Sequence, residues 1–357
     1  MQLFRRFWIV EVFLVLLALS LVLSPLSAEA NEGRTRSSQK KANHKTVNNK
    51  RVHKAGKRQA NVARAAAEDV STAKYADLVM DAETGRILHA TAPDELRHPA
   101  SLTKMMTLYL TFQALKSGQF TLNQRLPVSA HAASQAPSKL GLRAGNTIRV
   151  EDALLGLVTK SANDATVVIA EALGGTEEEF ARMMTRMARE LGMHSTVFRN
   201  ASGLPNPEQV TTARDMAILG HALVYHQARF YSYFSREGFT YAGVRHDNHN
   251  HLMKRYPGMD GIKTGYIRAS GFNLVASTMR GQTRLIAVVF GGRSAVMRDN
   301  RIAALLDQAF AQVQEERTTQ HARISTDTQT DSENKISARQ QVARASLRVD
   351  SSGYFSK

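Results

Sequence analysis

Hydrophobic and polar positions in the middle of the chain follow two periods, one of two residues and one of about 3.6. In the first pattern, residues 75–90 read YADLVMDAETGRILHA, two alternating runs about a Glu-Thr-Gly turn, which predicts a β-hairpin. Three apolar runs punctuated by glycine, at 261–267, 271–279 and 283–292, predict three further strands. The predicted strands therefore come from both ends of this region.

The stretch between these strands carries apolar residues at helical spacing. Runs of this kind cover 101–118, 149–175, 176–192 and 211–226, and a last amphipathic run covers 298–317. The run 149–175 is almost wholly apolar except at SAND, residues 161–164, so it predicts two buried helices with a polar break between them. Thr176 followed by three acids is typical of a helix N-terminus.

The order of elements is two strands, a long helical stretch, three strands and one helix. The simplest arrangement is one antiparallel sheet of about five strands, flanked by helices, with the middle helices forming a helical subdomain. We therefore expect an α+β fold over residues 70–313, without an internal repeat.

The first thirty residues have the pattern of a signal peptide. Two arginines precede an apolar run at 12–23, Pro25 ends the run, and Ala28-Glu29-Ala30 fits the small-x-small rule for cleavage. The run is shorter than the roughly 20 residues of a membrane span. If residues 7–10 are included, the apolar stretch is longer, and the alternative is a membrane anchor that is not cleaved. Either interpretation predicts that the following domain is exported.

The net charge of +16 is concentrated in one segment. Residues 31–65 hold eleven Lys and Arg against one acid, whereas 66–313 hold 27 against 22. Segment 31–69 is polar and is expected to be a disordered spacer. The alternative is adhesion to anionic lipid or an anionic wall polymer. Export argues against nucleic acid as a partner.

The chain becomes polar again after residue 313. Segment 314–357 has nearly balanced charge, and we expect a disordered tail with at most a short helix around 335–349. The chain has no cysteine, which excludes a thiol nucleophile and cysteine metal ligands.

A serine and a lysine lie one helical turn apart in HPASLTKMM, residues 98–106. Positions i and i+3 share a helix face, so Ser101 and Lys104 should lie side by side. A serine hydroxyl is a weak nucleophile until a base takes its proton, and a lysine acts as that base when burial lowers its pKa. Taken alone, the pair fits equally well with a serine cap and a solvated lysine.

Two further motifs accompany this pair. Ser161 and Asn163 lie in the polar break, where a buried hydroxyl and amide need partners or a task. Lys263, Thr264 and Gly265 begin a strand, where a cation and a hydroxyl can bind a carboxylate and a glycine lets a substrate backbone approach. Each motif alone has a structural explanation, as a capped turn or as an edge-strand lysine.

The three motifs in this order are the signature of penicillin-recognising serine enzymes. The chain resembles the D-alanyl-D-alanine carboxypeptidases of the low-molecular-mass penicillin-binding protein class. The resemblance covers nearly the whole core, through the strings MDAETGRILHA, HPASLTKMMT, SANDA, ARDMAILG, DGIKTGYIRASGFNLVAS and RLIAVVFGGR. It implies a β-lactamase/transpeptidase-like fold, peptidoglycan stem peptides as substrates and β-lactam antibiotics as covalent inhibitors.

The resemblance also implies roles in the reaction itself. Ser101 would attack the D-Ala–D-Ala carbonyl and become acylated, with Lys104 as its base. Ser161 would relay a proton to the leaving amine, and Lys263 would tune it electrostatically. The backbone amides of Ser101 and Tyr266 would form the oxyanion hole.

Further positions would bind the substrate. Asn163 would hydrogen-bond the amide of the acyl side chain, and Thr264 would bind the terminal carboxylate beside Gly265. Arg298, in GGRSAVMRD, would assist carboxylate recognition. Water would then hydrolyse the acyl-enzyme, and the chemistry needs no cofactor.

The region VRHDNHNHLMKRYPG raises the question of a metal because it holds His246, His249 and His251. No Asp/Glu–His pattern of known ligand spacing accompanies these residues, so we expect a polar loop at the rim of the site and no metal.

Three other functions compete with a carboxypeptidase. A D,D-endopeptidase would cut cross-links with the same machinery, and a wall-binding scaffold would carry an inactive site. A β-lactamase would need a deacylating glutamate, for which neither Glu171, 177–179 nor Glu190 is a convincing equivalent. At most weak β-lactamase activity is therefore expected.

Overall fold

The computed structural model describes residues 73–350, with the helical backbone alone at 321–332 and 342–350. The predicted signal peptide and the whole of the basic spacer lie outside the described residues. None of the helices within 73–350 is long and apolar enough to cross a membrane.

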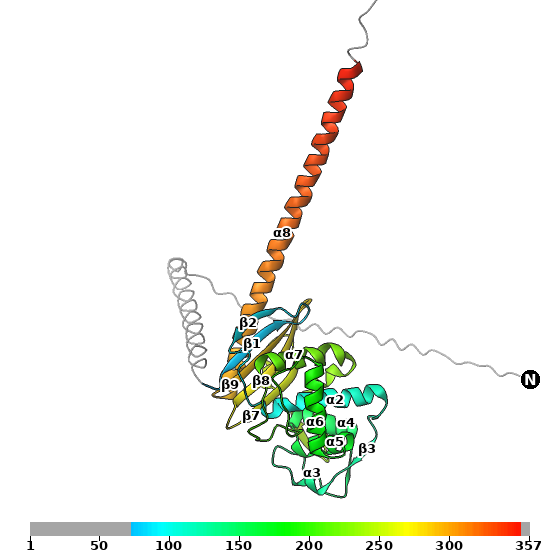
Figure 1. Ribbon diagram of the computed structural model, residues 1–357, viewed down its shortest axis with the longest axis vertical. Helices are drawn as coiled ribbons and strands as arrows, with labels where there is room; N and C mark the ends of the chain where they lie inside the picture. The colour runs from blue at the N-terminus through cyan, green and yellow to red at the C-terminus, as the bar shows by residue number, and fades with distance from the viewer. Residues whose placement is uncertain (1–72, 351–357) are drawn as a thin grey trace, which may run out of the picture. The chain divides into compact units, whose positions relative to one another are not determined.

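A five-stranded antiparallel sheet forms the centre of the fold (Figure 1). Its strand order is β2-β1-β9-β8-β7. The bounds are Ala76–Asp81 for β1, Ile87–Thr91 for β2, Met259–Ile267 for β7, Gly271–Arg280 for β8 and Thr283–Gly292 for β9. The strands come from both ends of the described region and meet at the β1–β9 pair, so the predicted sheet is confirmed.

The two faces of the sheet bury different sets of side chains because neighbouring residues in a strand point to opposite faces. The face toward the helical subdomain carries Leu78, Ile262, Val275, Ile286 and Val288. The opposite face carries Val79, Leu274, Leu285 and Val289, which pack on Ile302, Leu305 and Leu306. Each fully buried aliphatic side chain contributes about 1.5–3 kcal/mol relative to an exposed one.

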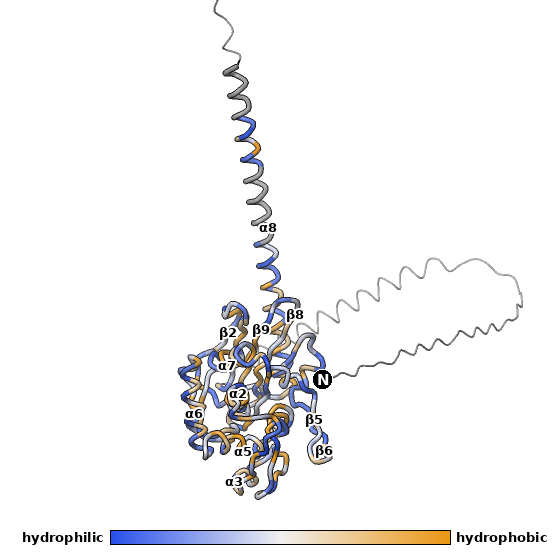
Figure 2. Tube along the Cα trace, turned by 90° about the vertical axis from the view of Figure 1, so that its right-hand side faces the viewer, coloured by the Kyte–Doolittle hydropathy of each residue, from blue (hydrophilic) through white to orange (hydrophobic). Residues whose placement is uncertain are grey.

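The helical part lies between β2 and β7 in the sequence. Its helices are η1 (Ala100–Thr103), α2 (Lys104–Ser117), α3 (Ala130–Ser134), α4 (Val150–Leu155), η2 (Gly156–Lys160), α5 (Asn163–Gly174), α6 (Glu177–Glu190), α7 (Ala213–His226), η3 (Ala228–Ser235) and η4 (His251–Lys254). Helix α7 covers the sheet, and α2, α4, α5 and α6 form the predicted helical subdomain (Figure 1). Figure 2 marks the long apolar run of α5 in orange.

Two short hairpins were not expected from the sequence. Strands β3 (Arg125–Pro127) and β4 (Thr147–Arg149) pair in one, and β5 (Gly238–Tyr241) and β6 (Val244–Asp247) pair in the other. Three- and four-residue strands are too short to show a period of two, which explains why the pattern gave no sign of them.

The last helix, α8, differs from the expectation of a disordered tail after residue 313. It runs without a break over Ala295–Asp350. Among the side chains of α8 that the structure describes, Val313 is the last buried one, and the buried apolar ones before it pack on the sheet. Beyond it, 314–324 and 333–349 contain many Gln, Arg, Glu and Ala residues, which favour helix once a packed first part has provided the nucleus. The run STDTQTDS at 325–332 has low helix propensity and is helical by continuation.

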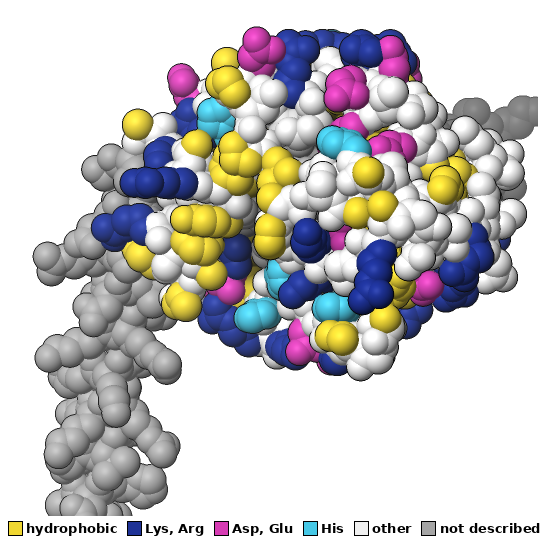
Figure 3. All heavy atoms as spheres, turned by 90° about the horizontal axis from the view of Figure 1, so that it is seen from below, with side chains coloured by type: hydrophobic (Ala, Val, Ile, Leu, Met, Phe, Trp, Pro, Cys, Tyr) yellow, Lys and Arg dark blue, Asp and Glu magenta, His cyan; other side chains and the backbone are white. Residues whose placement is uncertain are grey.

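Charges on the folded part are mixed, as the counts for 66–313 indicate. On the face shown in Figure 3, Lys and Arg side chains are interspersed with Asp and Glu. The folded part therefore differs from the basic segment 31–65, which accounts for most of the net charge.

Candidate active site

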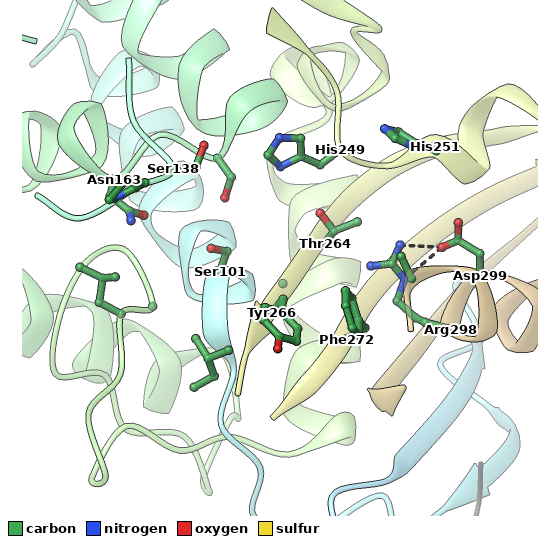
Figure 4. A pocket seen from close by; sticks show the side chains of 17 residues that line it. Ser101, Ser138, Asn163, His249, His251, Thr264, Tyr266, Phe272, Arg298 and Asp299 are labelled. Carbon is green, nitrogen blue, oxygen red and sulfur yellow. Dashed lines mark hydrogen bonds and ion pairs between the residues drawn. The ribbon is translucent and has the colours of Figure 1, made fainter. Parts of the chain in front are cut away.

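A cavity of about 420 Å³ opens between the edge strand β7 and the helical subdomain. This size falls within the range of small-molecule sites. Its lining, part of which is labelled in Figure 4, comprises Ser101, Pro137, Ser138, Ser161, Asn163, Gly203, Leu204, His249, His251, Thr264, Gly265, Tyr266, Ile267, Phe272, Ala295, Arg298 and Asp299. All three sequence motifs contribute to this one cavity.

Ser101 and Lys104 lie at the junction of two helices. Ser101 belongs to the single turn η1, and Lys104 is the first residue of α2. Lys104 Nζ lies 3.2 Å from Ser101 Oγ, so the predicted side-by-side arrangement of the two residues is observed.

The Lys104 amine is fully buried and has three oxygen neighbours. Besides Ser101 Oγ, Nζ donates to Asn163 Oδ1 at 2.7 Å and to the carbonyl of Ser202 at 2.6 Å. Burial lowers the pKa of Lys104 well below its ordinary value, and the charge of Lys263 lowers it further. Glu177 and Asp164 act in the opposite direction.

Burial and the charge of Lys263 favour a neutral amine, and the geometry lets such an amine accept a proton from the serine. Asn163 Oδ1 and the Ser202 carbonyl are acceptors only, so they take both N–H groups of a neutral amine. The lone pair is then left for Ser101 Oγ, the third neighbour. The arrangement fits the requirement of a general base within hydrogen-bond reach of its nucleophile.

Ser161 follows the π-turn η2 in a left-handed conformation, with φ 57°. Such a conformation costs free energy in a residue other than glycine. Its Oγ is buried and has no hydrogen-bond partner among the described residues. A buried hydroxyl without a partner is also costly, so both features indicate a group reserved for a ligand in the cavity.

Asn163 uses both ends of its side-chain amide within the protein. Its Oδ1 accepts from Lys104, and its Nδ2 donates to the carbonyl of Ala136 at 2.8 Å. The next residue, Asp164, accepts from the backbone amides of Leu140, Gly141 and Leu142 at 2.8–3.0 Å. The start of α5 therefore positions both the lysine and the loop that forms one wall of the cavity.

Strand β7 brings a second buried lysine to the site. Lys263 is 2% exposed, and its Nζ donates to the backbone carbonyl of Thr264 at 2.9 Å. Burial lowers the pKa of Lys263 to about 7, with a further contribution from the charge of Arg298. The Thr264 side chain lines the cavity directly, and Tyr266 lies further along the strand (Figure 4).

Gly265 lets β7 approach the serine closely. A Cβ at this position would lie 3.1 Å from both the Pro99 carbonyl and the Ser101 amide nitrogen. Asn273, opposite Gly265 on β8, donates to the carbonyls of His98 and Pro99 at 3.3 and 3.4 Å. The segment before the serine is thus fixed to the sheet.

Arg298 lines the cavity but is largely occupied by its neighbour. Its Nε and Nη2 donate to Asp299 Oδ1 at 3.0 and 2.7 Å, as the dashed lines in Figure 4 show. Its Nη1 donates to the Asn273 carbonyl at 3.3 Å. The predicted carboxylate contact would therefore have to share this guanidinium with Asp299.

Two of the three histidines lie at the cavity. His249 and His251 line it, whereas His246 belongs to β6. Burial, followed by the charges of Lys263 and Lys160, lowers the pKa of His249 to about 4. Within residues 73–350, no group of three or more His, Asp or Glu side chains is arranged to hold a metal ion.

Sequence reasoning missed several residues that form the site. Ser138, Leu204 and Phe272 line the cavity, and the Ser202 carbonyl contacts Lys104. Gly203, at φ +89°, packs on the segment before the serine. The Gly-Leu-Pro run at 203–205 was a visible turn signal, but it did not indicate proximity to Ser101.

The site places a serine hydroxyl and a buried lysine amine side by side at one cavity, which is the arrangement of a nucleophile and its base. A family model described as D-alanyl-D-alanine carboxypeptidase, peptidase S11, matches residues 61–294. The chain therefore belongs to the S11 family of D-alanyl-D-alanine carboxypeptidases.

Individual relatives agree with this assignment. Over 240 residues the chain is 37% identical to D-alanyl-D-alanine carboxypeptidase DacF of Bacillus subtilis, covering 66% of this chain and 61% of that protein. Penicillin-binding protein 5 from Haemophilus influenzae matches with TM-score 0.64 and 35% identity over 66% of this chain and 70% of that chain. Penicillin-binding protein D2 from Listeria monocytogenes, in its cefotaxime-bound form, matches with TM-score 0.58 and 28% identity over 66% and 96%. The chain spans 61% of the length of DacF.

The close packing at Gly203 leads to a prediction. A Cβ there would lie 1.9 Å from the Ala100 carbonyl oxygen, so Gly203→Ala must displace the backbone beside Ser101. We expect acylation by a labelled penicillin to slow by about a hundredfold or more, the effect of a misplaced nucleophile.

The matched control is Gly118→Ala, which has a similar φ of +80° but nothing within 4 Å of the added Cβ. It should lower the free energy of unfolding by about 1 kcal/mol and leave the acylation rate unchanged. Equal acylation rates in both variants would show that Gly203 does not position the serine.

Proposed function

We propose that the protein is a serine D,D-carboxypeptidase that removes the terminal D-alanine from peptidoglycan stem pentapeptides, and that penicillin acylates the same serine. The observation that carries the proposal is the buried Lys104 amine, which lies 3.2 Å from Ser101 Oγ and has its remaining protons matched to two carbonyl oxygens. Membership of the S11 family supports the choice of substrate.

In the proposed acylation, Ser101 Oγ attacks the carbonyl carbon between the two D-alanines, and its proton passes to Lys104 Nζ. The backbone amides of Ser101 and Tyr266 donate to the oxygen that becomes negative. The intermediate then collapses, the C–N bond breaks, and the leaving amine takes a proton relayed through Ser161. Water hydrolyses the ester and restores the Ser101 hydroxyl.

Ser161 is suited to this relay because its unpartnered hydroxyl lines the same cavity as Ser101. Lys263 would favour proton transfer through its nearby charge. The proposed role of Asn163 is twofold: it holds Lys104, and it binds the amide of the acyl side chain by exchanging its bond to the Ala136 carbonyl.

The terminal carboxylate of the substrate would bind at the Thr264 end of the cavity. The Thr264 hydroxyl would donate to it, and the buried cation of Lys263 would attract it. Arg298 adds positive charge at the same end, although Asp299 already binds its guanidinium. Penicillin carries an equivalent carboxylate, which explains why one site would accept both molecules.

The cavity also argues against efficient β-lactamase activity. The glutamates considered for a deacylating role, Glu171, Glu177, Glu178, Glu179 and Glu190, are absent from the cavity lining. The carboxylate that does line the cavity, Asp299, is bound by Arg298. With no glutamate at the site to activate water, the penicilloyl ester should be long-lived.

The function is tested by release of D-alanine from a stem pentapeptide and of D-alaninamide from its C-terminal amide, with Ser101→Ala as the blank. Thr264→Val keeps the shape but removes one hydrogen bond to the carboxylate, worth roughly 1.5–3 kcal/mol. We expect kcat/KM on the free acid to fall about ten- to hundredfold, with little change on the amide.

An equal loss on acid and amide would show that Thr264 supports the geometry of the site and does not read the carboxylate. Activity on cross-linked wall fragments with none on the free pentapeptide would favour an endopeptidase.

The export signal and the basic segment extend the proposal to location. The protein would reside in the periplasm or cell envelope, with residues 31–65 attracted to an anionic wall polymer or membrane surface.

Deleting 31–65 should leave turnover of the soluble pentapeptide unchanged but weaken binding to purified wall sacculi. That binding should fall as salt rises, because screening shortens to about 10 Å at 0.1 M. Equal, salt-insensitive binding by both proteins would leave the segment a passive spacer.

A further inference from the structure

Glu177 is a buried carboxylate behind the cavity wall. It is the first residue of α6, is 8% exposed, and is not among the residues that line the cavity. Its Oε1 accepts from the Ala201 backbone amide at 3.0 Å, and its Oε2 lies 2.8 Å from His131 Nε2. None of these contacts is with a group that would touch the substrate.

The loop 201–203 that Glu177 holds touches both members of the reactive pair. The Ser202 carbonyl accepts from Lys104 Nζ at 2.6 Å, and Gly203 packs against the Ala100 carbonyl next to Ser101. The Ala201 carbonyl accepts from Thr107 Oγ1 at 2.8 Å, which ties the same loop to α2. Glu177 therefore fixes the loop from one side and α2 fixes it from the other.

Glu177 also contributes charge at the lysine. The charged groups that act on Lys104 are Lys263, which favours the neutral amine, and Glu177 and Asp164, which favour the ammonium. Asp164 is already bound by several backbone amides, whereas Glu177 has one amide and one histidine. Because His131 pairs with Glu177, a protonated His131 would offset the charge that Glu177 exerts on Lys104.

We propose that Glu177 is a positioning residue of the active site, which holds loop 201–203 against Lys104, and that its pair with His131 sets the pH at which Lys104 becomes a base. The inference rests on the proposed function of Ser101 and Lys104, and it adds a titratable control from outside the cavity.

The direction of this control follows from the charges. A carboxylate near Lys104 stabilises the ammonium form. Removing that carboxylate lowers the pKa of Lys104, so the amine becomes neutral at a lower pH. The hydrogen bond to Glu177 raises the pKa of His131, and the charges of Glu171 and Glu178 raise it further. A protonated His131 offsets the charge of Glu177 and so also favours the neutral base.

The experiment is the second-order rate of acylation by a labelled penicillin between pH 4 and 10, in the full-length protein. In Glu177→Gln the acid limb of the profile should move to lower pH by about half a unit or more, because one negative charge that acts on Lys104 is removed. Glu177→Ala should show this shift together with a plateau lowered about tenfold or more, since the Ala201 amide loses its acceptor.

His131→Gln provides the opposite test. The side chain of His131 is 51% exposed, so the replacement should not prevent folding. Without the imidazolium of His131, the negative charge of Glu177 is no longer offset. The acid limb should then move to higher pH. Glu190→Gln, an exposed charge change on the same helix, should leave the profile unchanged.

Loss of plateau rate in both Glu177 variants with an unmoved acid limb would overturn the proposal, since loop support alone does not shift a titration. Acid limbs in Glu177→Gln and His131→Gln that match the wild type would overturn it as well. A wild-type protein that forms no penicillin adduct would instead contradict the proposed function.

Discussion

An amine without access to water governs the construction of this site. Lys104 lies at 0% exposure, and a buried cation of this kind is stable only when its charge is removed or compensated. The protein supplies two carbonyl oxygens and a hydroxyl, and it places Lys263 in the same region, which further disfavours the charged form. The result is a base held next to its nucleophile, as acyl transfer by a serine requires.

This constraint explains why distant parts of the chain must meet. The lysine comes from α2, its amide acceptor from the start of α5, and its backbone acceptor from the loop after α6. The sheet adds the opposite wall, because Gly265 allows β7 to lie against the Ser101 segment and Asn273 ties that segment to β8. A fold that shifted any of these elements would leave the amine with an unmatched proton.

Much of the fold and site could be predicted because the signals reside in side chains. Alternation marked the first two strands, apolar runs punctuated by glycine marked the other three, and helical spacing marked the long helices. Ser101, Ser161, Asn163 and Thr264 line one cavity, and the buried Lys104 contacts Ser101 and Asn163. The SAND segment reads as a polar break whose buried groups need partners or a task, and the structure shows a buried Ser161 hydroxyl without a partner among the described residues. The left-handed backbone of Ser161 was not foreseen.

The rest could not be read from the sequence for physical reasons. The Ser202 acceptor is a backbone carbonyl, which every residue possesses, so no residue type points to it. The pairing of Arg298 with the adjacent Asp299 depends on rotamers, and Glu177 reaches its partners only through tertiary packing. The continuation of α8 to Asp350 depends on the packed start of the helix, which segment 314–357 does not contain.

The account depends most directly on the protonation of Lys104. The measurement is an NMR titration of its ¹³Cε and ¹⁵Nζ signals in the full-length protein, assigned by their absence from Lys104→Met. The account predicts a midpoint well below 10.5, with a neutral amine at the pH where acylation reaches its plateau. A midpoint near 10.5, or an ammonium that persists across that plateau, would contradict it.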